Sequence, residues 1–460
     1  MKTELKTISH RLASVRGSEA RKAARECLIR AVSAKNDDGT SKDPCDWQDQ
    51  PTPHDIAREM CELVAGKADG YVVLFSLEML ESLVFDFRIS PEKIVFIGDR
   101  KVENGIASYY GVHTELLSKE TSWNKTALKD ALKNTLRQGI QAMKFDKLAV
   151  VMNPPYQLST GGHGRDAKPI YNVFIETVID ELQPDYLVSI NPSRWMIGGK
   201  SELDRFRSRM ISDRRLKIIA DFPGLRDIFP SVEITGGVNY FLWDKSHNGP
   251  CTFNGVDRYL DEEDTIIREN EARPILKKIK SKTNKWVSEC ASPSKPYGLR
   301  GNAPTSTAGV PCWFKQSIGL AKVNPNTVSN PRNDLDTWRV LAPQALPHGG
   351  LTFIRDGKYF ERQSIVVAAP GEACTETFIV LKSFKTKAEA ENFITYIYTR
   401  FFRFVLRMRT VSQHITRDCY SWVPDLDCSK PWTDKELFKQ FGLSRQEQAY
   451  IERKIKVQSK

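Results

Sequence analysis

One stretch decides the fold of this 460-residue chain: Leu148-Ala149-Val150-Val151-Met152-Asn153-Pro154-Pro155-Tyr156. Its first five residues are all apolar, which predicts a short buried strand. Two prolines cannot donate to the ladder of a sheet, and the first disfavours a helical conformation at Asn153, so the strand must end there. The corner that follows therefore gathers an amide, two fixed backbone carbonyls and an aromatic ring in one small volume.

This Asn153-Pro154-Pro155-Tyr156 corner has the groups needed to methylate an exocyclic amine on a base. Such an amine is a weak nucleophile because its lone pair is delocalised into the ring. An Asn oxygen and a Pro carbonyl can each accept one of its N–H groups, which stabilises the nitrogen as it becomes positive in the transition state. Tyr156 can stack on a base taken out of the duplex. The alternative is an ordinary strand-ending turn, in which Asn and Pro are common.

Length and composition describe a globular protein with room for two domains, with 40% hydrophobic and 27% charged residues. No apolar run approaches the length of a bilayer-crossing helix and the N-terminus is unlike a signal peptide, so we expect a cytoplasmic protein. The nine cysteines contain no C-x-x-C pair, so neither a metal site nor a disulfide frame is expected. The net charge of +11 suits a polyanionic partner, although many basic proteins bind no nucleic acid.

Apolar strands alternate with helices through the first half of the chain, which predicts an α/β fold with a doubly wound parallel sheet. Ligands of such sheets lie at the carboxyl ends of the strands, where Asn153 and Asp99 both fall. Asp99 is well placed to hold a ribose, and the alternative is a turn Asp after Gly98. Thr52-Pro53 is expected to begin a helix, with Thr52 as its N-cap. The predicted strands are 71–75, 94–97, 148–152, 186–190, 218–222 and 237–243, and helices are expected at 76–85 and 171–182.

From about residue 250 the alternation breaks and turns become frequent. Thr386 and Glu389 form a capping box for a long helix over roughly 387–409, and the pairs Thr433/Glu436 and Ser444/Glu447 cap two closing helices. On the long helix, Arg400, Arg403 and Arg407 share one face. Interleaved with aromatic residues, this face can pack the domain and contact phosphate together. The alternative is a solvated arginine stripe.

These residues resemble the DNA adenine-N6 methyltransferases of restriction–modification systems, in their gamma-class order. The resemblance covers nearly the whole chain from about Trp47. Asn153-Pro154-Pro155-Tyr156 matches the catalytic motif of the family and Thr52-Pro53 its N-terminal cofactor motif. The four-residue motif alone also occurs in RNA and protein-glutamine methyltransferases. Further similar segments are Pro169-Ile170-Tyr171, Pro192-Ser193-Arg194-Trp195, Asp227-Ile228-Phe229-Pro230, Gly236-Gly237-Val238, Phe401-Phe402-Arg403-Phe404, Trp422-Val423-Pro424 and Trp432-Thr433-Asp434.

The resemblance implies a Rossmann-like, doubly wound methyltransferase sheet followed by a mixed α+β target-recognition domain. On this basis residues 51–250 are expected to be the S-adenosyl-L-methionine-dependent methyltransferase domain and 251–460 the target-recognition domain with C-terminal helices. Residues 1–50 lie before the resemblance; their helical spacing and basic residues predict a basic helical arm and linker, which could contact phosphates or be a solvated helix. The resemblance also implies site-specific transfer of a methyl group from S-adenosyl-L-methionine to the N6 amine of adenine in double-stranded DNA. A restriction endonuclease subunit is then a potential partner.

Residue roles follow from the same resemblance. Asn153 and Pro154 would bind the target amine, with Pro155 completing the corner. Tyr156 would stack on the extruded adenine and Phe229 on its other face, although a core position is an alternative for Phe229. The expected cofactor contacts are Thr52, Phe75, Glu78, Asp99 and Asn153, and the expected DNA contacts are Arg194, Lys295, Arg300, Arg400 and Arg403.

One departure from the family concerns the turn after the first strand. The family usually has Asp-Pro and then Gly-x-Gly there, whereas this chain has Leu74-Phe75-Ser76-Leu77-Glu78-Met79, without glycine. A side chain at each position should crowd the approach of the backbone to the cofactor. Glu78 can replace the missing acid and pair with the methionine amino group; alternatively the cofactor sits differently, or this half binds it weakly or is inactive. The alternative functions are therefore a DNA-binding, catalytically weak or inactive subunit, and an RNA or protein N-methyltransferase.

Overall fold

The computed structural model of the chain describes residues 51–117, 125–141, 143–158, 168–198, 201–223, 236–315, 318–345, 365–410 and 414–456. They belong to two compact units, and the main change from one unit to the next falls between Asp264 and Thr265. A short segment, Met196–Gly198, belongs to the second unit although it lies within the sequence of the first. The basic arm expected at 1–50 lies outside the described residues.

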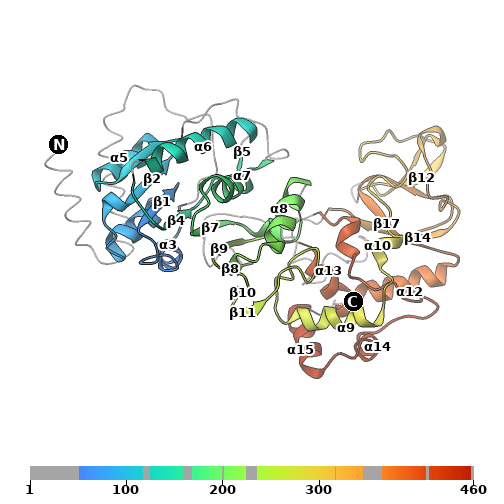
Figure 1. The fold of residues 1–460 in the computed structure, drawn as a ribbon. Helices are drawn as coiled ribbons and strands as arrows, with labels where there is room; N and C mark the ends of the chain where they lie inside the picture. The colour runs from blue at the N-terminus through green and yellow to red at the C-terminus, as the bar shows by residue number, and fades with distance from the viewer. Residues whose placement is uncertain are drawn as a thin grey trace. The chain divides into compact units, whose positions relative to one another are not determined.

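A nine-stranded sheet forms the centre of the first unit (Figure 1). All six predicted strands are present, but the sheet is not wholly parallel as predicted, because β9 runs antiparallel to both of its neighbours, β7 and β8. The strands, in the order β11-β10-β8-β9-β7-β4-β1-β2-β3 across the sheet, are β1 (Gly70–Leu74), β2 (Ile94–Gly98), β3 (His113–Leu116), β4 (Leu148–Met152), β7 (Tyr186–Pro192), β8 (Leu216–Phe222), β9 (Val238–Asp244), β10 (Cys251–Phe253) and β11 (Val256–Arg258).

The direction of strand addition reverses between β1 and β4. From β1 the chain adds β2 and β3 on one side, and then returns to add β4 and β7 on the other. β1 and β4 are parallel neighbours, with Leu74 opposite Met152. Such a reversal opens a crevice outside the carboxyl ends of the two strands, and ligands of α/β sheets bind there. The topology therefore puts the candidate site where β1 and β4 end.

Helices cover both faces of this part of the sheet, since every residue of β1, β2 and β4 is buried. On one face α3, α4 and α5 share a core with Tyr71, Val73 and Phe96. α6 packs on the other face, where Gly139 lies close against Val95; Figure 1 shows α6 and α3 on opposite sides of the strands. The helices are α3 (His54–Glu62), α4 (Leu77–Glu81) continued by the π-helix Ser82–Asp86, α5 (Lys101–Tyr109), α6 (Lys125–Gln141), α7 (Tyr171–Thr177) continued by the π-helix Val178–Leu182, and α8 (Ser201–Ser212).

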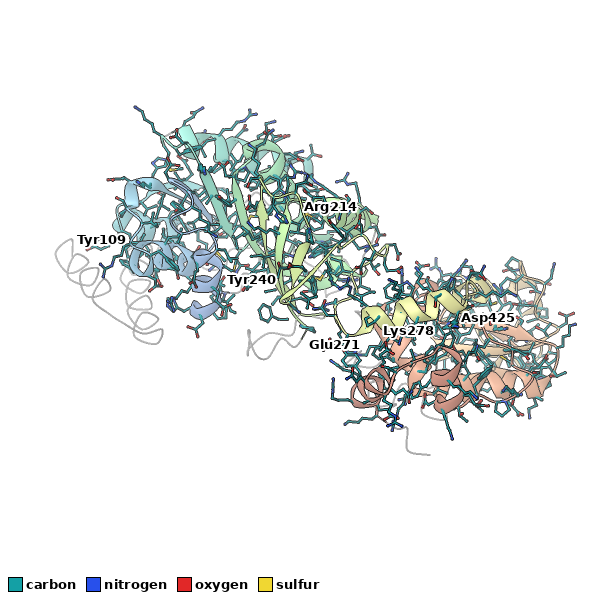
Figure 2. The ribbon with its side chains drawn as sticks, turned by 60° about the horizontal axis from the view of Figure 1, so that its bottom comes forward. Tyr109, Arg214, Tyr240, Glu271, Lys278 and Asp425 are labelled. Carbon is teal, nitrogen blue, oxygen red and sulfur yellow. The ribbon has the colours of Figure 1, made fainter. Side chains whose placement is uncertain are left out.

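The second unit is mixed α+β, as predicted, with two three-stranded sheets and six α-helices among its described residues. Its core includes apolar residues of α9, α12, α13 and β17. Lys278 of α9, labelled in Figure 2, pairs with Glu447 at 2.6 Å. The elements are α9 (Ala272–Lys282), α10 (Val287–Cys290), β12 (Val310–Trp313), β13 (Leu320–Val323), β14 (Trp338–Pro343), β15 (Val366–Ala368), β16 (Ala373–Cys374), β17 (Phe378–Phe384), α12 (Lys387–Tyr398), α13 (Arg400–Met408), α14 (Asp434–Gln440) and α15 (Arg445–Lys454).

The long helix predicted over 387–409 is wrong in one respect, because it is two helices that meet at Thr399. This residue is extended, with φ −63° and ψ 151°, and its hydroxyl accepts from Phe402 N to cap α13. Thr at an N-cap satisfies a backbone donor that a continuous helix would have used internally. The three predicted capping boxes, at Thr386, Thr433 and Ser444, are confirmed.

Candidate functional site

The Asn153–Tyr156 corner leaves the sheet directly at the end of β4. Asn153 N donates to Leu74 O at 3.2 Å, which continues the ladder between β1 and β4 by one residue. Ile170 N donates to Tyr156 O at 3.2 Å, and two short strands, Gln157–Leu158 and Lys168–Pro169, pair just beyond. Asn153 is 7% exposed and Tyr156 5% exposed. The corner is therefore held from both sides, against β1 and against the start of α7.

Thr52 lies against this corner instead of capping a helix. The prediction of Thr52 as N-cap is wrong: the cap position of α3 is Pro53, without a side-chain capping bond. The Thr52 hydroxyl accepts from Asn153 Nδ2 at 3.0 Å, in a contact where Thr52 is only 1% exposed. The amide nitrogen of Asn153 is thus turned toward Thr52, and the amide oxygen occupies the other branch of the side chain.

Ser76 extends the cluster to Glu78. Its hydroxyl donates to Glu78 Oε2 at 2.9 Å and lies 3.4 Å from the Thr52 hydroxyl oxygen. It also accepts from Met79 N at 3.3 Å, as the N-cap of α4. Ser76 was not among the predicted site residues, although a serine between a strand and a helix is a common N-cap signal. Through Ser76 the structure connects three predicted residues: Thr52, Glu78 and Asn153.

Phe75, in the turn where the family has glycines, has a left-handed backbone with φ +59°. A non-glycine residue in this region destabilises the fold by about 1–2 kcal/mol, so the surrounding structure must enforce it. Phe75 N donates to Ile97 O at 3.0 Å, and its ring meets the ring of Phe174 edge to face at 5.3 Å. The turn therefore has a conformation favoured by glycine, and it directs the Phe75 ring against α7.

Asp99 lies at the end of β2, beside β1, and is 9% exposed. The preceding Gly98 leaves room for Asn104 of α5: a Cβ at Gly98 would fall 2.2 Å from Asn104 Oδ1. Asn104 Nδ2 in turn donates to Glu115 O of β3 at 2.8 Å. Asp99 directly follows β2, and Glu78 lies in the first turn of α4, the helix that follows the neighbouring strand β1. Carboxylate acceptors of this kind fit a ligand with hydroxyl and ammonium donors.

Several predicted DNA contacts lie on exposed positions. Arg194 is exposed at the corner after β7. Lys295 and Arg300 are exposed in the second unit, and Lys295 pairs with Glu376 at 3.2 Å. Phe229, predicted to stack on the base, lies outside the described residues.

The predicted arginine face of α13 is not a free surface. Arg403 is fully buried: its guanidinium donates to Thr399 O at 3.3 Å and Lys456 O at 2.7 Å, and burial lowers its pKa to about 10. The expected DNA contact from Arg403 is therefore corrected, because the side chain already satisfies carbonyls inside the unit. Arg400 pairs with Glu452 at 3.2 Å and Arg407 with Glu269 at 2.5 Å. Of these three arginines, only Arg400 is still proposed to contact DNA.

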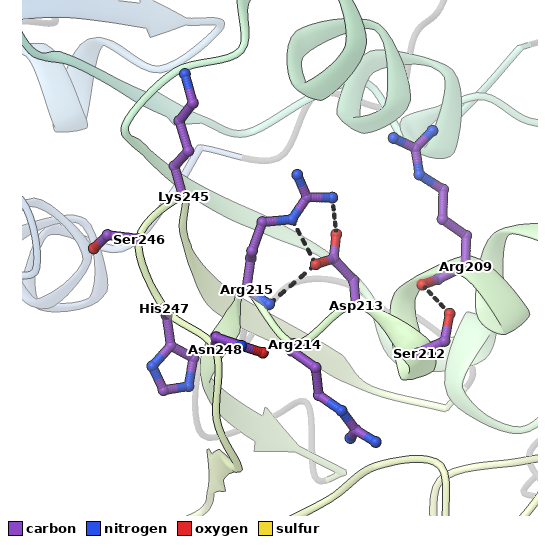
Figure 3. Close-up of a pocket in the computed structure, with 9 residues that line it drawn as sticks. All are labelled: Arg209, Ser212, Asp213, Arg214, Arg215, Lys245, Ser246, His247 and Asn248. Atoms are coloured by element: carbon purple, nitrogen blue, oxygen red, sulfur yellow. Dashed lines mark hydrogen bonds and ion pairs between the residues drawn. The ribbon is translucent and has the colours of Figure 1, made fainter.

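A separate open cavity of about 560 Å³ lies where α8 ends and β8 begins (Figure 3). Figure 3 shows Arg215 reaching Asp213, through Nε and Nη2 at 2.8 Å each. Arg214 pairs with Asp261 at 2.7 Å. The cavity lies at the amino end of β8, whereas Asn153 lies at the carboxyl end of the parallel strand β4. The arginines that line the cavity form ion pairs with carboxylates. The cavity does not overlap the predicted site.

Within the described ranges no group of His, Cys, Asp and Glu side chains is arranged to hold a metal ion. Across the same residues, no helix combines the length and apolarity that a membrane span requires.

Part of the first unit is similar to a known sequence family. Residues 90–229 match the family described as Eco57I restriction-modification methylase, a span that includes β2, β4, the Asn153–Tyr156 corner and β8. A curated relative from Mycoplasma pneumoniae, named an uncharacterized adenine-specific methylase, is 36% identical over 127 residues. That match covers 27% of this chain and 29% of the relative, so it spans less than a third of either protein.

Two solved structures are similar at low identity. The methyltransferase subunit of a type I restriction-modification system from Streptococcus thermophilus is 15% identical, with 51% of this chain and 54% of that chain covered and a TM-score of 0.30. The type IIG restriction endonuclease BpuSI is 11% identical, with 90% of this chain and 62% of that chain covered and a TM-score of 0.39. Over residues 90–229, the family match confirms the resemblance to restriction–modification methylases that the motifs indicated.

Proposed function

Because residues 90–229 match a restriction-modification methylase family, we propose that this chain is a site-specific DNA methyltransferase. It transfers a methyl group from S-adenosyl-L-methionine to the N6 amine of adenine in double-stranded DNA, as part of a restriction–modification system. The adenine assignment is supported by the name of the Mycoplasma pneumoniae relative and by the chemistry of the Asn153 corner.

The observation that supports this function most is the bond from Asn153 Nδ2 to the Thr52 hydroxyl, at 3.0 Å. This bond turns the Asn153 amide nitrogen toward Thr52 and its oxygen away from Thr52, and an amide oxygen is a hydrogen-bond acceptor. An acceptor is what the weakly nucleophilic amine needs, because both of its N–H groups become more acidic as the nitrogen attacks. The Pro154 carbonyl accepts the second N–H, and its position is fixed by the proline ring.

The bound cofactor supplies a methyl group on a positive sulfur. The cofactor would leave as a neutral thioether, and the methylated nitrogen would lose its surplus proton to water. Glu78 and Asp99 would hold the cofactor through its amino group and its ribose hydroxyls, with Thr52 and Phe75 beside them. The residues around Asn153 act by holding the amine in line with the methyl group, which removes much of the entropic barrier. Tyr156 stacks on the base, which requires its buried ring to become accessible when DNA binds.

The test is a methyl-transfer assay with labelled S-adenosyl-L-methionine and three acceptors: double-stranded DNA, RNA and protein. Transfer to DNA alone, at adenine N6, is the expected result. Asn153→Ala should abolish transfer while leaving DNA affinity unchanged. The amide that this substitution removes contacts the reacting amine and not the DNA backbone. Full activity of Asn153→Ala, or transfer to RNA or protein alone, contradicts the proposal.

A second candidate is a DNA-binding subunit whose cofactor half no longer functions. The observation that favours it is the glycine-free turn, in which Phe75 takes a left-handed conformation that glycine adopts without strain. Calorimetric titration with S-adenosyl-L-methionine, with and without DNA, distinguishes the two candidates. Binding supports the enzyme, and no heat of binding under either condition leaves only the second candidate.

Sequence recognition belongs, in this proposal, to the second unit, with Lys295, Arg300 and Arg400 among the DNA contacts, and a restriction endonuclease is the expected functional partner. DNA from cells that express the chain should contain methyladenine in one short sequence context. Sequencing with a method sensitive to methyladenine identifies that context, and methylation without any sequence preference contradicts this assignment.

A further inference from the structure

A row of polar side chains crosses three neighbouring strands of the first unit, β7, β9 and β8, near the end of the sheet where β7 and β8 finish. Asn239 of β9 lies directly opposite Asn191 of β7 and opposite Asp221 of β8. Residues directly opposite one another in antiparallel strands have their side chains on the same face. The three side chains therefore stand in line, and Ser193 follows Asn191 at the end of β7. Asn191, Ser193 and Asn239 are fully buried, and Asp221 is 5% exposed.

Hydrogen bonds join this polar row, which we define as Asn191, Ser193, Asp221 and Asn239. The Ser193 hydroxyl donates to Asp221 Oδ1 at 2.7 Å and accepts from Asn239 Nδ2 at 3.2 Å. Asn239 Nδ2 also donates to Asn191 O at 3.1 Å. Ser193 is thus the one member bonded to side chains on both β8 and β9, through a donor and an acceptor on the same oxygen.

The polar row is not needed to form the sheet. Its three strands are otherwise mostly apolar, and a buried polar group stabilises a fold only when its hydrogen bonds are made. Apolar side chains would bury the same surface without that requirement. Asn191 Oδ1 and Asn239 Oδ1 are buried without a hydrogen-bond partner among the described residues, so the row is only partly satisfied. Its bonds through Ser193 still join the end of β7 to β8 and β9, and they restrict the backbone there in a way that an apolar core does not.

The segment fixed here is the corner Ser193-Arg194-Trp195. Besides its side-chain bonds, Ser193 N donates to Gly237 O at 2.9 Å. On the other side of Arg194, Trp195 is fully buried and meets the ring of Phe206 edge to face at 5.5 Å. Arg194 is therefore exposed between two anchored neighbours, so its backbone has little freedom.

The strand before Arg194 is a neighbour of the strand before the Asn153–Tyr156 corner: β7 pairs in parallel with β4, and Ser189 lies opposite Met152. Arg194 lies in the 3-10 helix that directly follows β7, and Asn153 directly follows β4, so both chain segments leave the sheet at the same end. Arg194 and Tyr156, the residue proposed to stack on the base, thus follow two neighbouring parallel strands at the same end of the sheet.

We propose that Ser193, Asp221 and Asn239 are positioning residues that hold Arg194 at this edge, where its guanidinium binds a DNA phosphate next to the extruded base. This inference rests on the proposed function. Base extrusion separates a nucleotide from its neighbours, and an arginine whose backbone is already fixed binds the flanking phosphate without losing further backbone freedom. The polar row affects DNA affinity through Arg194. In the sheet, β4 separates the row from β1 and β2, the strands that precede the proposed cofactor residues.

The experiment is a double-mutant cycle on the full chain with Ser193→Ala, Arg194→Ala and the double variant. It measures DNA dissociation constants, KM for DNA and S-adenosyl-L-methionine affinity. Each single substitution should weaken DNA binding roughly tenfold, in line with the loss of one well-placed charged contact. The double variant should be no weaker than Arg194→Ala, because Ser193 acts through Arg194. Arg194→Ala should also lower the salt dependence of DNA binding by about one phosphate contact.

Ser189→Ala is the matched control. Ser189 is buried on the same strand and the same face, two residues before Asn191, and its hydroxyl has no hydrogen-bond partner among the described residues. It should bind DNA as the wild type does, and Ser193→Thr should restore most of the affinity. If Ser193→Ala does not fold, Asp221→Asn enters the same cycle.

Additive effects of Ser193→Ala and Arg194→Ala, in a chain that binds DNA, overturn the positioning role and leave the proposed function intact. An equal loss of cofactor affinity in Ser193→Ala also overturns it, because that result indicates a general structural defect. Absence of DNA binding by the wild-type chain overturns both proposals.

Discussion

Asn153 donates its side-chain N–H to the hydroxyl of Thr52 over 3.0 Å, although the two residues lie 101 positions apart in the sequence. The bond joins the segment before α3 to the end of β4, and both side chains are almost completely buried. A buried bond of this kind fixes which atom of the Asn153 amide faces Thr52 and which faces away from it. We therefore expect substitutions of Thr52, as well as of Asn153, to change the rate of the proposed reaction.

Thr52→Val keeps the shape of the side chain and removes the acceptor. The Asn153 amide then loses a buried partner, which should destabilise the fold by about 1–3 kcal/mol. Because the amide is free to turn, we also expect methyl transfer to fall by tenfold or more, as small misplacements of reacting groups often cause. Thermal unfolding and single-turnover transfer rates measure the two effects. Thr52→Ser retains the hydroxyl and should stay close to wild type in both; a Thr52→Val enzyme with normal rates contradicts the orienting role.

The Tyr156 hydroxyl is buried and has no hydrogen-bond partner among the described residues, and burial raises its pKa well above the ordinary value. Removing it in Tyr156→Phe should be neutral or stabilise the fold by up to about 1 kcal/mol, since an unpartnered buried hydroxyl is unfavourable. Transfer should persist because the aromatic face remains. Tyr156→Ala should destabilise by about 3–5 kcal/mol and lose transfer. Denaturant unfolding and the transfer assay test this, and a large loss of activity in Tyr156→Phe shows that the hydroxyl has a catalytic contact.

Two glycines of the first unit share φ +79° and differ in the space beside them. A Cβ at Gly237 would lie 2.1 Å from Phe222 O, whereas a Cβ at Gly255 meets nothing within 4 Å. Gly255→Ala should therefore destabilise by about 1–2 kcal/mol, the strain of a left-handed alanine alone. Gly237→Ala should destabilise by more than about 3 kcal/mol, because strands β8 and β9 must also separate. Equal unfolding midpoints for the two variants would show that β9 can shift freely.

Acid should weaken the second unit through Glu269. Burial favours a raised pKa for this carboxyl, but the charge and hydrogen bond of Arg407, with Tyr450 and Lys454, outweigh it and lower the pKa to about 2. A lowered pKa stabilises the fold above the ordinary glutamate value, and this stabilisation is lost as the pH falls from about 5 toward 2. Glu269→Gln should remove much of that pH dependence and lower stability at neutral pH. The control is Glu391→Gln, an exposed position paired with Lys387, and unfolding curves at several pH values provide the measurement. An unchanged acid transition in Glu269→Gln excludes this carboxyl as its cause.

Local sequence predicted much of the fold. The six apolar runs became strands because burial on both faces requires nearly continuous apolar residues. The antiparallel direction of β9 was not predicted, since its apolar pattern contains no information about strand direction. β3 was not predicted either, because an edge strand with the sequence His-Thr-Glu-Leu is polar and partly exposed. The helix break at Thr399 was not predicted, because the amphipathic pattern continues through this residue and gives no sign of the N-cap.

The candidate site divides in the same way. By itself the sequence determined that a strand must end at Asn153 and that an amide, prolines and a tyrosine follow it, because proline geometry and apolar burial act between near neighbours in the chain. Only the tertiary structure decided that Thr52 and Ser76 complete this corner, that Phe75 takes the glycine-like turn and that Arg403 is enclosed within its own unit. Those outcomes depend on hydrogen bonds and packing between segments distant in the sequence, and such contacts exist only once the sheet has assembled.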